Sequence, residues 1–491
     1  MASLKDPGAI LLISCYEQGH QPLSIASPAA VLRGAGFSPA GLDLSQQPFD
    51  AAAARRARLV AVAVPMHTAL RLGVRAAERV REANPEAAIV YYGLYATLNA
   101  ATLLAEKMSP GGGPGAAAVI GGECEEPLLR LAVAMEAAGG VAPPGPIPGV
   151  RTRAHLAPPW IARVSLALPD RSDLPPIARY VKVEENGVRR AAGQVEATRG
   201  CLHRCRHCPI PPVYGGRFFV VPREIVLEDV RRQVEAGATH ITFGDPDFLN
   251  GPGHTLALAR ALHAAHPDVT FDLTAKVEHL LRHRERLSEL RDLGCLFVVT
   301  AVESLSDRVL AILDKGHTRA DIEALLALAR GAGLALRPTW LPFTPWSGLD
   351  DYLEMLDFAV SWDLIDAVDP VQWSIRLLVP PGSLLESHPE FLPARGRLDA
   401  GRFTWTWTHA DPRVDELQRS VAQLAEAGAI AGDDPRATFA AIARGAARAA
   451  GAARGARFGA ALSTLSVPPP GPTAAALAKG RPARLTEPWF C

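Results

Sequence analysis

The chain has 491 residues, with 51 lysines and arginines balanced by 51 aspartates and glutamates, and 48% of its residues are hydrophobic. A length of this order predicts about three domains with substantial cores. The balanced charge argues against a nucleic-acid partner, which would need a basic patch, and no apolar run approaches the roughly 20 residues of a membrane-spanning helix.

The N-terminal segment, residues 1–140, alternates strand-like and helix-like patterns. Buried strands are predicted at 9–14, 59–65, 87–93 and 116–122, and helices at 27–36, 68–85 and 125–140. This alternation predicts a parallel sheet with helices on both faces, a flavodoxin-like or Rossmann-like α/β fold. Ligands of such folds bind at the carboxyl ends of the strands.

Residues 141–193 are rich in proline and glycine, which predicts a linker. The β–α alternation resumes over 194–395, with strands expected at 194–198, 239–245, 269–275, 296–304, 334–343 and 369–379. Six such units predict a partial (β/α)6 TIM-like barrel whose chemistry lies at the carboxyl ends of its strands. A small helical C-terminal region is expected at 396–465, and a flexible tail at 466–491.

The stretch "EATRGCLHRCRHCPI" (196–210) places Cys201, Cys205 and Cys208 directly after a predicted strand. Soft thiolates select zinc, copper(I) or iron–sulfur clusters. A closed four-iron cluster takes four cysteines, but the chain's other four cysteines are remote in sequence. Three thiols would leave one iron of such a cluster open to a small molecule.

This spacing after the first strand of a βα barrel resembles the radical S-adenosylmethionine superfamily. The resemblance implies that the three cysteines hold a 4Fe–4S cluster and that the open iron binds S-adenosylmethionine. It also implies that one electron cleaves this cofactor to a 5′-deoxyadenosyl radical, which abstracts hydrogen from the substrate. His207 stands before the third cysteine, at a position that is often aromatic in the family and near the adenine.

A zinc site is the main alternative for this loop, with His203 or His207 as the fourth ligand. The protein would then be a non-catalytic zinc or iron–sulfur protein that senses redox state or binds partners. A zinc knuckle would not need a strand before it and five βα units after it, so the context favours the enzyme.

Two further barrel strands end in candidate cofactor-binding residues. In "TFGDPDF" (242–248), Gly244, Asp245 and Asp247 match a family motif whose polar groups hold the amino group of S-adenosylmethionine, although a plain turn is the alternative. Glu303 and Ser304 end a strand where family members contact the ribose or methionine part. The alternative there is a helix cap, for which Ser306 is the expected residue.

Arg376 is a charged residue in an otherwise apolar predicted strand, "WSIRLLVPPGS". Its side chain could bind a carboxylate inside the barrel as a cofactor contact, or extend outward to solvent. Lys276, after "FDLTA", is a weaker candidate of the same kind.

The N-terminal segment also resembles the cobalamin-binding domain of many radical enzymes, through "VIGGECEEPLLRLA" (119–132) and residues 77–99. The Asp-x-His-x-x-Gly motif, which supplies a histidine to cobalt in some cobalamin proteins, is absent. Cobalamin would therefore bind without that ligand, or the domain would only help to bind substrate. His67, which follows a strand, is an isolated candidate for the lower face of the cobalt.

The tail ends in "EPWFC", and together with residues 403–421 it resembles the CUAEP/CCAEP-tail radical S-adenosylmethionine (seleno)protein family. The resemblance implies a reading frame that continues through a selenocysteine codon after Cys491. An ordinary chain terminus with an incidental thiol is the alternative.

Seven cysteines without a signal peptide indicate a reducing cytoplasm. The resemblance further implies an electron donor such as flavodoxin or ferredoxin. The substrate, a small molecule or a peptide, is named by no motif, and neither a nucleic-acid nor a membrane partner is expected.

Overall fold

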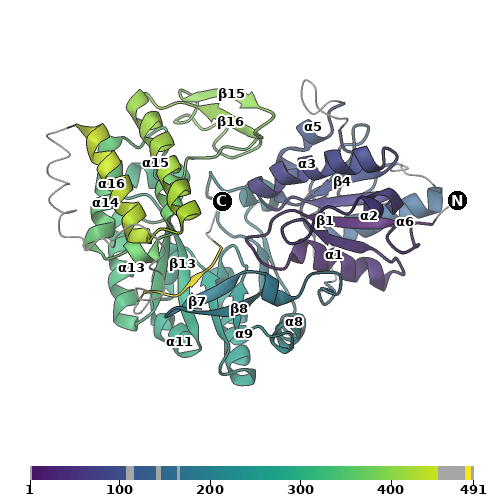
Figure 1. The fold of residues 1–491 in the computed structure, drawn as a ribbon, viewed down its shortest axis with the longest axis horizontal. Coiled ribbons are helices and arrows are strands. Elements are labelled where there is room, and N and C mark those ends of the chain that lie inside the picture. The colour runs from purple at the N-terminus through teal and green to yellow at the C-terminus, as the bar shows by residue number, and fades with distance from the viewer. Residues whose placement is uncertain (1–2, 107–114, 140–144, 163–165, 452–480, 488–491) are drawn as a thin grey trace.

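The computed structural model describes residues 3–106, 115–139, 145–162, 166–451 and 481–487. Two α/β units lie side by side, and the C-terminal helices pack against the second (Figure 1). Among the described residues, the search for a helix long and apolar enough to cross a membrane finds none.

The N-terminal sheet has the strand order β2-β1-β3-β4-β5-β6, with only β6 antiparallel to its neighbour. Its strands are β1 (Ile10–Ser14), β2 (Ala40–Asp43), β3 (Leu59–Ala63), β4 (Ala88–Tyr92), β5 (Ala118–Ile120) and β6 (Val150–Arg151). Strands β1, β3 and β4 are buried along their whole length, as continuous apolar runs between two helical layers should be. The order of the parallel strands is that of flavodoxin-like folds, which confirms the predicted fold class.

Helices cover both faces of this sheet. They are α1 (Leu23–Gly34), α2 (Ala51–Arg56), α3 (His67–Ala83), α4 (Leu94–Leu98), α5 (Ala100–Leu103) and α6 (Glu125–Ala138). Helices α1 and α6 share one hydrophobic core, and α2 and α3 share the other. In α3, Leu70, Ala77 and Val80 are fully buried because their spacing places them on one face of the helix.

The second sheet has the order β14-β13-β12-β11-β8-β7-β17, in which the strands from β8 to β14 are parallel. Its strands are β7 (Lys182–Glu185), β8 (Val188–Val195), β11 (His240–Phe243), β12 (Thr270–Thr274), β13 (Cys295–Glu303), β14 (Ala335–Trp340) and β17 (Arg484–Leu485). The curled parallel part is the predicted partial barrel.

The sixth predicted barrel strand, 369–379, is not a regular strand. Residues Pro370–Ser374 form a 3-10 helix, η5, and only one parallel bridge, between Phe343 and Arg376, continues the barrel. Pro370 has no N–H to donate to a sheet ladder, and Trp373 is buried against Phe439 at a ring-centroid distance of 5.3 Å. The apolar pattern therefore reports burial in the core and not strand pairing.

Helices alternate with the barrel strands and bury one apolar face each. They are α8 (Arg223–Glu235), α9 (Pro252–Ala265), α10 (Val277–Arg282), α11 (Leu287–Asp292), α12 (Asp307–Leu313), α13 (Arg319–Ala332) and α14 (Leu349–Ser361). Ser306 caps α12 as predicted, because its hydroxyl accepts from the N–H of Val309. Thr318 and Asp321 form a capping box at the start of α13.

Part of the predicted linker, 141–193, is regular structure. Strand β6, strand β7 and the start of β8 lie within it, and β7 and β8 form an antiparallel hairpin. Asn186 and Gly187 join them with φ values of 49° and 80°. An Asn-Gly pair in this conformation is the preferred two-residue hairpin turn, and this signal could have been found in the sequence.

The C-terminal region adds a hairpin and two long helices to the barrel. These are β15 (Arg395–Asp399), β16 (Thr404–Trp407), α15 (Pro412–Ala431) and α16 (Pro435–Ala450). In contrast with the expected flexible tail, β17 pairs with β7, with Arg484 opposite Glu184 and Leu485 opposite Val183. Cys491 lies outside the described residues.

Candidate active site

The three cysteines lie on a loop that a small hairpin holds in place. Strand β9 (Thr198–Gly200) pairs with β10 (Phe218–Val220), and helix α7 (Ile210–Tyr214) lies between them. Gly200 has φ 79°, and a Cβ on it would lie 2.5 Å from the carbonyl oxygen of Arg217. That same carbonyl accepts a hydrogen bond from the N–H of Cys201 at 3.1 Å. Glycine is thus required where the loop begins.

Arg206 fixes the middle of the loop to the end of α12. Its N–H donates to the carbonyl of Leu313 at 2.9 Å. Its guanidinium donates to the carbonyls of Ala311 and Ile312 at 2.9 and 2.7 Å. These orphan carbonyls at a helix end attract a cation, so the loop has a defined position on the barrel.

Cys201, Cys205 and Cys208 have free thiols and line one cavity of about 560 Å³. Burial raises the pKa of Cys201 to about 11 and raises the pKa of Cys208 further. Without a metal, Cys201 and Cys208 are therefore neutral thiols, and metal binding would release their protons. Three thiols converging on one cavity are a donor set that fits an iron–sulfur cluster with one open iron.

Both domains close this cavity. The N-terminal domain and the C-terminal strand contribute Gln18, His20, Pro65, Met66, His67, Leu94, Tyr95, Leu485 and Glu487. The cavity therefore lies between the carboxyl ends of the two sheets, where both fold types place their ligands.

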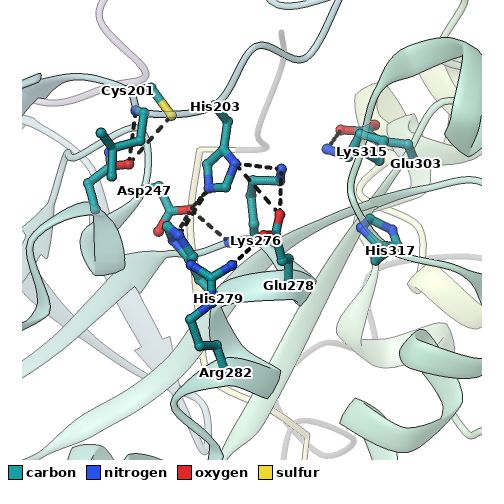
Figure 2. Close-up of polar contacts among 12 residues, drawn as sticks. Cys201, His203, Asp247, Lys276, Glu278, His279, Arg282, Glu303, Lys315 and His317 are labelled. Carbon is teal, nitrogen blue, oxygen red and sulfur yellow. Dashed lines mark hydrogen bonds and ion pairs between the residues drawn. The ribbon is translucent and has the colours of Figure 1, made fainter. Parts of the chain in front are cut away.

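Glu303 has two charged or ionisable neighbours beside the cysteine loop. Its Oε1 is 3.2 Å from Nζ of Lys315 (Figure 2) and 3.5 Å from Nε2 of His207. Burial alone would raise the pKa of Glu303, but Lys315 and His207 lower it to about 2. Glu303 also has φ 67° at the end of β13, an unusual conformation for a residue with a side chain. The carboxylate is ionised, and it faces the cavity together with His207.

Gly244 and Asp245 line the cavity as well, but Asp245 has no free carboxylate oxygen. Oδ2 accepts from the N–H of Ala197 at 3.0 Å, and Oδ1 accepts from the hydroxyl of Thr198. A Cβ on Gly244 would lie 2.6 Å from the side-chain nitrogen of Gln194, so a larger residue there would require the Gln194 side chain to move. Asp245 thus supports the start of the cysteine loop.

Asp247 and Ser304 are not among the cavity-lining residues. Asp247 is fully buried, and its Oδ1 accepts from the N–H of Leu249 at 2.9 Å. The hydroxyl of Ser304 accepts from the N–H of Ser306 at 3.1 Å. Both side chains therefore stabilise the conformation of the backbone that follows them.

Arg376 lines the cavity, but its guanidinium is engaged on the C-terminal region. Nη1 lies 2.6 Å from Oδ1 of Asp415, Nη2 donates to the carbonyl of Trp407 at 2.8 Å, and the group lies 3.5 Å from the centre of the Trp407 ring. The sequence left two roles open for Arg376: binding a carboxylate inside the barrel as a cofactor contact, or extending outward to solvent. A carboxylate contact is observed, but the carboxylate is that of Asp415 in α15.

Sequence reasoning missed Lys315 and His279. Lys315 occurs in a "KGH" that no short motif singles out, and it is 2% exposed. His279 meets His203 from a position 76 residues away, at 3.1 Å between their Nε2 atoms.

The N-terminal domain contacts the barrel through Arg199. Its Nη1 lies 2.9 Å from Oε2 of Glu123 and 2.7 Å from Oε1 of Glu125, and Tyr214 donates to Glu123 at 2.8 Å. Both glutamates are buried, and burial raises the pKa of Glu123. These charges tie the domains together next to the cysteine loop.

Residues 195–356 match the Radical SAM superfamily. The chain contains a radical SAM domain. Such a domain implies a 4Fe–4S cluster and S-adenosylmethionine, the two cofactors that the cysteine spacing predicts.

Two curated relatives of the radical SAM domain are methylthiotransferases. A putative methylthiotransferase of Methanocaldococcus jannaschii, MJ0865, is 26% identical over 198 residues, which are 38% of this chain and 42% of the relative. The ribosomal protein uS12 methylthiotransferase RimO of Desulfosudis oleivorans is 29% identical over 233 residues, which are 44% of this chain and 48% of the relative. The chain thus matches less than half the length of these relatives. With the radical SAM domain, they indicate an enzyme.

Two solved structures share the arrangement of both domains. The cobalamin-dependent S-adenosylmethionine radical enzyme OxsB, with aqua-cobalamin and S-adenosylmethionine bound, has a TM-score of 0.65 at 15% identity and covers 86% of this chain and 67% of its own. The radical S-adenosylmethionine methyltransferase TsrM of Kitasatospora setae, with cobalamin and a [4Fe-4S] cluster bound, has a TM-score of 0.54 at 19% identity and covers 72% of this chain and 70% of its own. At these identities the similarity shows the fold.

Proposed function

We propose that the chain is a radical S-adenosylmethionine enzyme in which Cys201, Cys205 and Cys208 hold a 4Fe–4S cluster. The observation that supports this most directly is that all three free thiols line one cavity between the two domains. The bound cluster would supply the electron that cleaves S-adenosylmethionine to a 5′-deoxyadenosyl radical. The walls from both domains would exclude water from that reaction.

Three further residues are proposed to contact S-adenosylmethionine directly: His207, Gly244 and Glu303. They line the cavity next to the cysteines, and Glu303 is an anion available to a polar group of the cofactor. We propose that Asp245, Asp247, Ser304 and Arg376 do not contact S-adenosylmethionine directly, because each has polar atoms hydrogen-bonded within the protein.

We also propose that the N-terminal domain binds cobalamin without a histidine ligand. Pro65, Met66 and Leu94 present an apolar wall to the cavity, which fits the face of a large macrocycle. Nε2 of His67 is engaged elsewhere, because it lies 2.7 Å from the carbonyl oxygen of Arg402. OxsB and TsrM, which share the fold, bind cobalamin. Cobalamin absorbance that stays with the protein after gel filtration would support this; its loss would contradict it.

The deciding experiment is anaerobic cleavage of S-adenosylmethionine. The reconstituted protein is mixed with S-adenosylmethionine and dithionite, and 5′-deoxyadenosine is measured, with Cys205→Ala as the control. Product from the parent chain and none from the variant is expected. One zinc and no iron in the reconstituted protein would instead favour the zinc or redox-sensing alternative.

The same proposal includes a cellular compartment, an electron donor and a class of substrate. A cytoplasmic flavodoxin or ferredoxin would donate the electron, because the thiols need a reducing compartment. The substrate would be a small molecule or a peptide that enters the cavity between the domains.

A further inference from the structure

Two histidines and one aspartate meet under the cysteine loop, outside the set of cysteines (Figure 2). His203 comes from the loop itself, Asp247 precedes the 3-10 helix η2 (Phe248–Asn250), and His279 lies in α10. Nε2 of His203 is 3.1 Å from Nε2 of His279 and 3.7 Å from Oδ2 of Asp247. Nδ1 of His279 is 2.9 Å from the same Oδ2.

We propose that His203, Asp247 and His279 bind one divalent transition-metal ion, zinc or ferrous iron, at a site separate from the three cysteines. One donor atom from each residue can be chosen so that all three lie within 4.8 Å of one another. An ion bound at about 2.0–2.2 Å from each donor needs them about 3.0–3.5 Å apart. The distances of 3.1 and 3.7 Å from Nε2 of His203 are close to this requirement. His279 approaches His203 with Nε2 and Asp247 with Nδ1, and only one of these nitrogens can bind the ion, so the His279 ring would have to shift for the third separation, now within 4.8 Å, to reach it.

The donor types suit these metals. Imidazole is a common ligand of zinc and iron, and two histidines with one carboxylate leave coordination positions open. Oδ1 of Asp247 accepts from the N–H of Leu249, which leaves Oδ2 directed at the two rings. Oriented ligands of this kind raise metal affinity.

This site is accessible on the side formed by His203 and is closed on the side of the other two residues. The Asp247 side chain is 0% exposed and that of His279 is 4% exposed, whereas that of His203 is 14% exposed and lines the cavity. An ion would therefore turn its open coordination positions towards the cavity that the cysteines line. It could bind an oxygen or nitrogen atom of a molecule held there.

Lys276 and Glu278 surround the outer nitrogen of His203. Nδ1 of His203 is 3.0 Å from Nζ of Lys276 and 3.7 Å from Oε2 of Glu278, and these two partners are 3.5 Å apart. When Nε2 binds a metal, Nδ1 carries the proton, and Glu278 is the acceptor within reach. The Lys276 ammonium, which is also a donor, would then have to turn away from Nδ1 and towards Glu278. Without a metal, the same side chains form a chain of hydrogen bonds, which is the alternative that the test separates.

The test uses the full-length chain and no S-adenosylmethionine, so its outcome is independent of the proposed radical reaction. Cys201, Cys205 and Cys208 are replaced together by serine, and the protein is titrated with Co²⁺ without oxygen. We expect one Co²⁺ per chain, with ligand-field bands and no thiolate charge-transfer band. His279→Gln in this background should weaken binding at least about tenfold. The matched control is His283→Gln, whose ring lies 6.4 Å from that of His279 and next to α10.

Two results would overturn the metal site: no Co²⁺ bound by the triple-serine chain, or equal binding after His279→Gln. Circular dichroism checks that the variants fold. Should His279→Gln unfold, metal analysis of the reconstituted parent chain decides. One zinc or one iron per chain retained beyond the four irons of the cluster, together with ligand-field bands in the triple-serine chain, supports the site. A metal content of the four cluster irons alone refutes it.

Discussion

Nζ of Lys315 lies 3.2 Å from Oε1 of Glu303 beside the cysteine loop, and the two side chains are only 3% and 12% exposed. Charges removed from water cost several kcal/mol each unless they are paired. Oε1 of Glu303 also lies 3.5 Å from Nε2 of His207, which precedes the third cysteine. The end of β13 is thereby joined electrostatically to the loop.

Replacing Glu303 with glutamine leaves Lys315 buried without its counter-ion. We expect the free energy of unfolding to fall by about 3–5 kcal/mol, measured by denaturant unfolding. The matched control is Glu390→Gln, which breaks a pair with Arg308 at 2.8 Å whose side chains are 45% and 68% exposed. That change should cost less than about 1 kcal/mol. Equal losses in the two variants would contradict the structure.

The same pair predicts a dependence on pH. The pKa of Glu303 is lowered to about 2, below its ordinary value of about 4.3. The ionised form therefore stabilises the fold above about pH 4.3, and this contribution is lost as the pH falls towards 2. The difference in unfolding free energy between the parent chain and Glu303→Gln should shrink across this window, measured without the cluster. A difference that stays constant would argue against a lowered pKa.

Arg199 holds two buried glutamates of the other domain. Arg199→Met leaves Glu123 and Glu125 without their cation, and we expect a loss of about 3–5 kcal/mol. Calorimetry should also show a separate transition for the N-terminal domain, because the ionic contact through Arg199 that couples it to the barrel is gone. Arg232→Met is the control: its pair with Glu228 is largely exposed to solvent, so the loss should be much smaller than for Arg199→Met. A single unchanged transition in Arg199→Met would contradict the expected role.

Arg376→Lys tests whether this residue supports the fold or binds the cofactor. Lysine keeps the charge but loses the planar contacts with Trp407 and the two-point bonding. We expect the free energy of unfolding to fall by about 1–2 kcal/mol, with the KM for S-adenosylmethionine changed less than about twofold. A large rise in KM with unchanged stability would restore the cofactor-binding role.

Removing residues 481–491 should free the outer edge of β7. Thr486 and Lys182 share two hydrogen bonds, of 2.8 and 3.0 Å, across this edge. Their loss should speed amide hydrogen exchange in β7 by about tenfold or more. The parent chain is the reference. Slow exchange in the shortened chain would mean that β7 is protected without β17.

The cysteine loop and most of the sheets could be predicted because their signals are local. Cys201, Cys205 and Cys208 fall within eight consecutive positions, and the apolar runs of β11 to β14 each fit one strand. A short apolar run reports burial, however, and it cannot tell a strand from the 3-10 turn that Pro370 begins.

The polar part of the site could not be predicted in the same way. His203 and His279, and likewise Glu303 and Lys315, become neighbours only when the loop, a helix and a strand end meet. Asp245 illustrates the opposite error. Its position at a strand end was identified, but its hydrogen bonds to Ala197 and Thr198 depend on the path of another loop.

The pairing of β17 with β7 also bears on aggregation. Arg484 lies opposite Glu184, so the partners stand 300 positions apart (484 − 184), and contacts this distant in sequence form late in folding. Until then the edge of β7 offers unpaired backbone groups to any other extended chain. Strand β7 of the hairpin carries Lys182, Glu184 and Glu185, and two arginines follow in β8. Charged side chains on an open edge discourage such pairing. These charges thus protect the edge of β7 during folding, until β17 pairs with it.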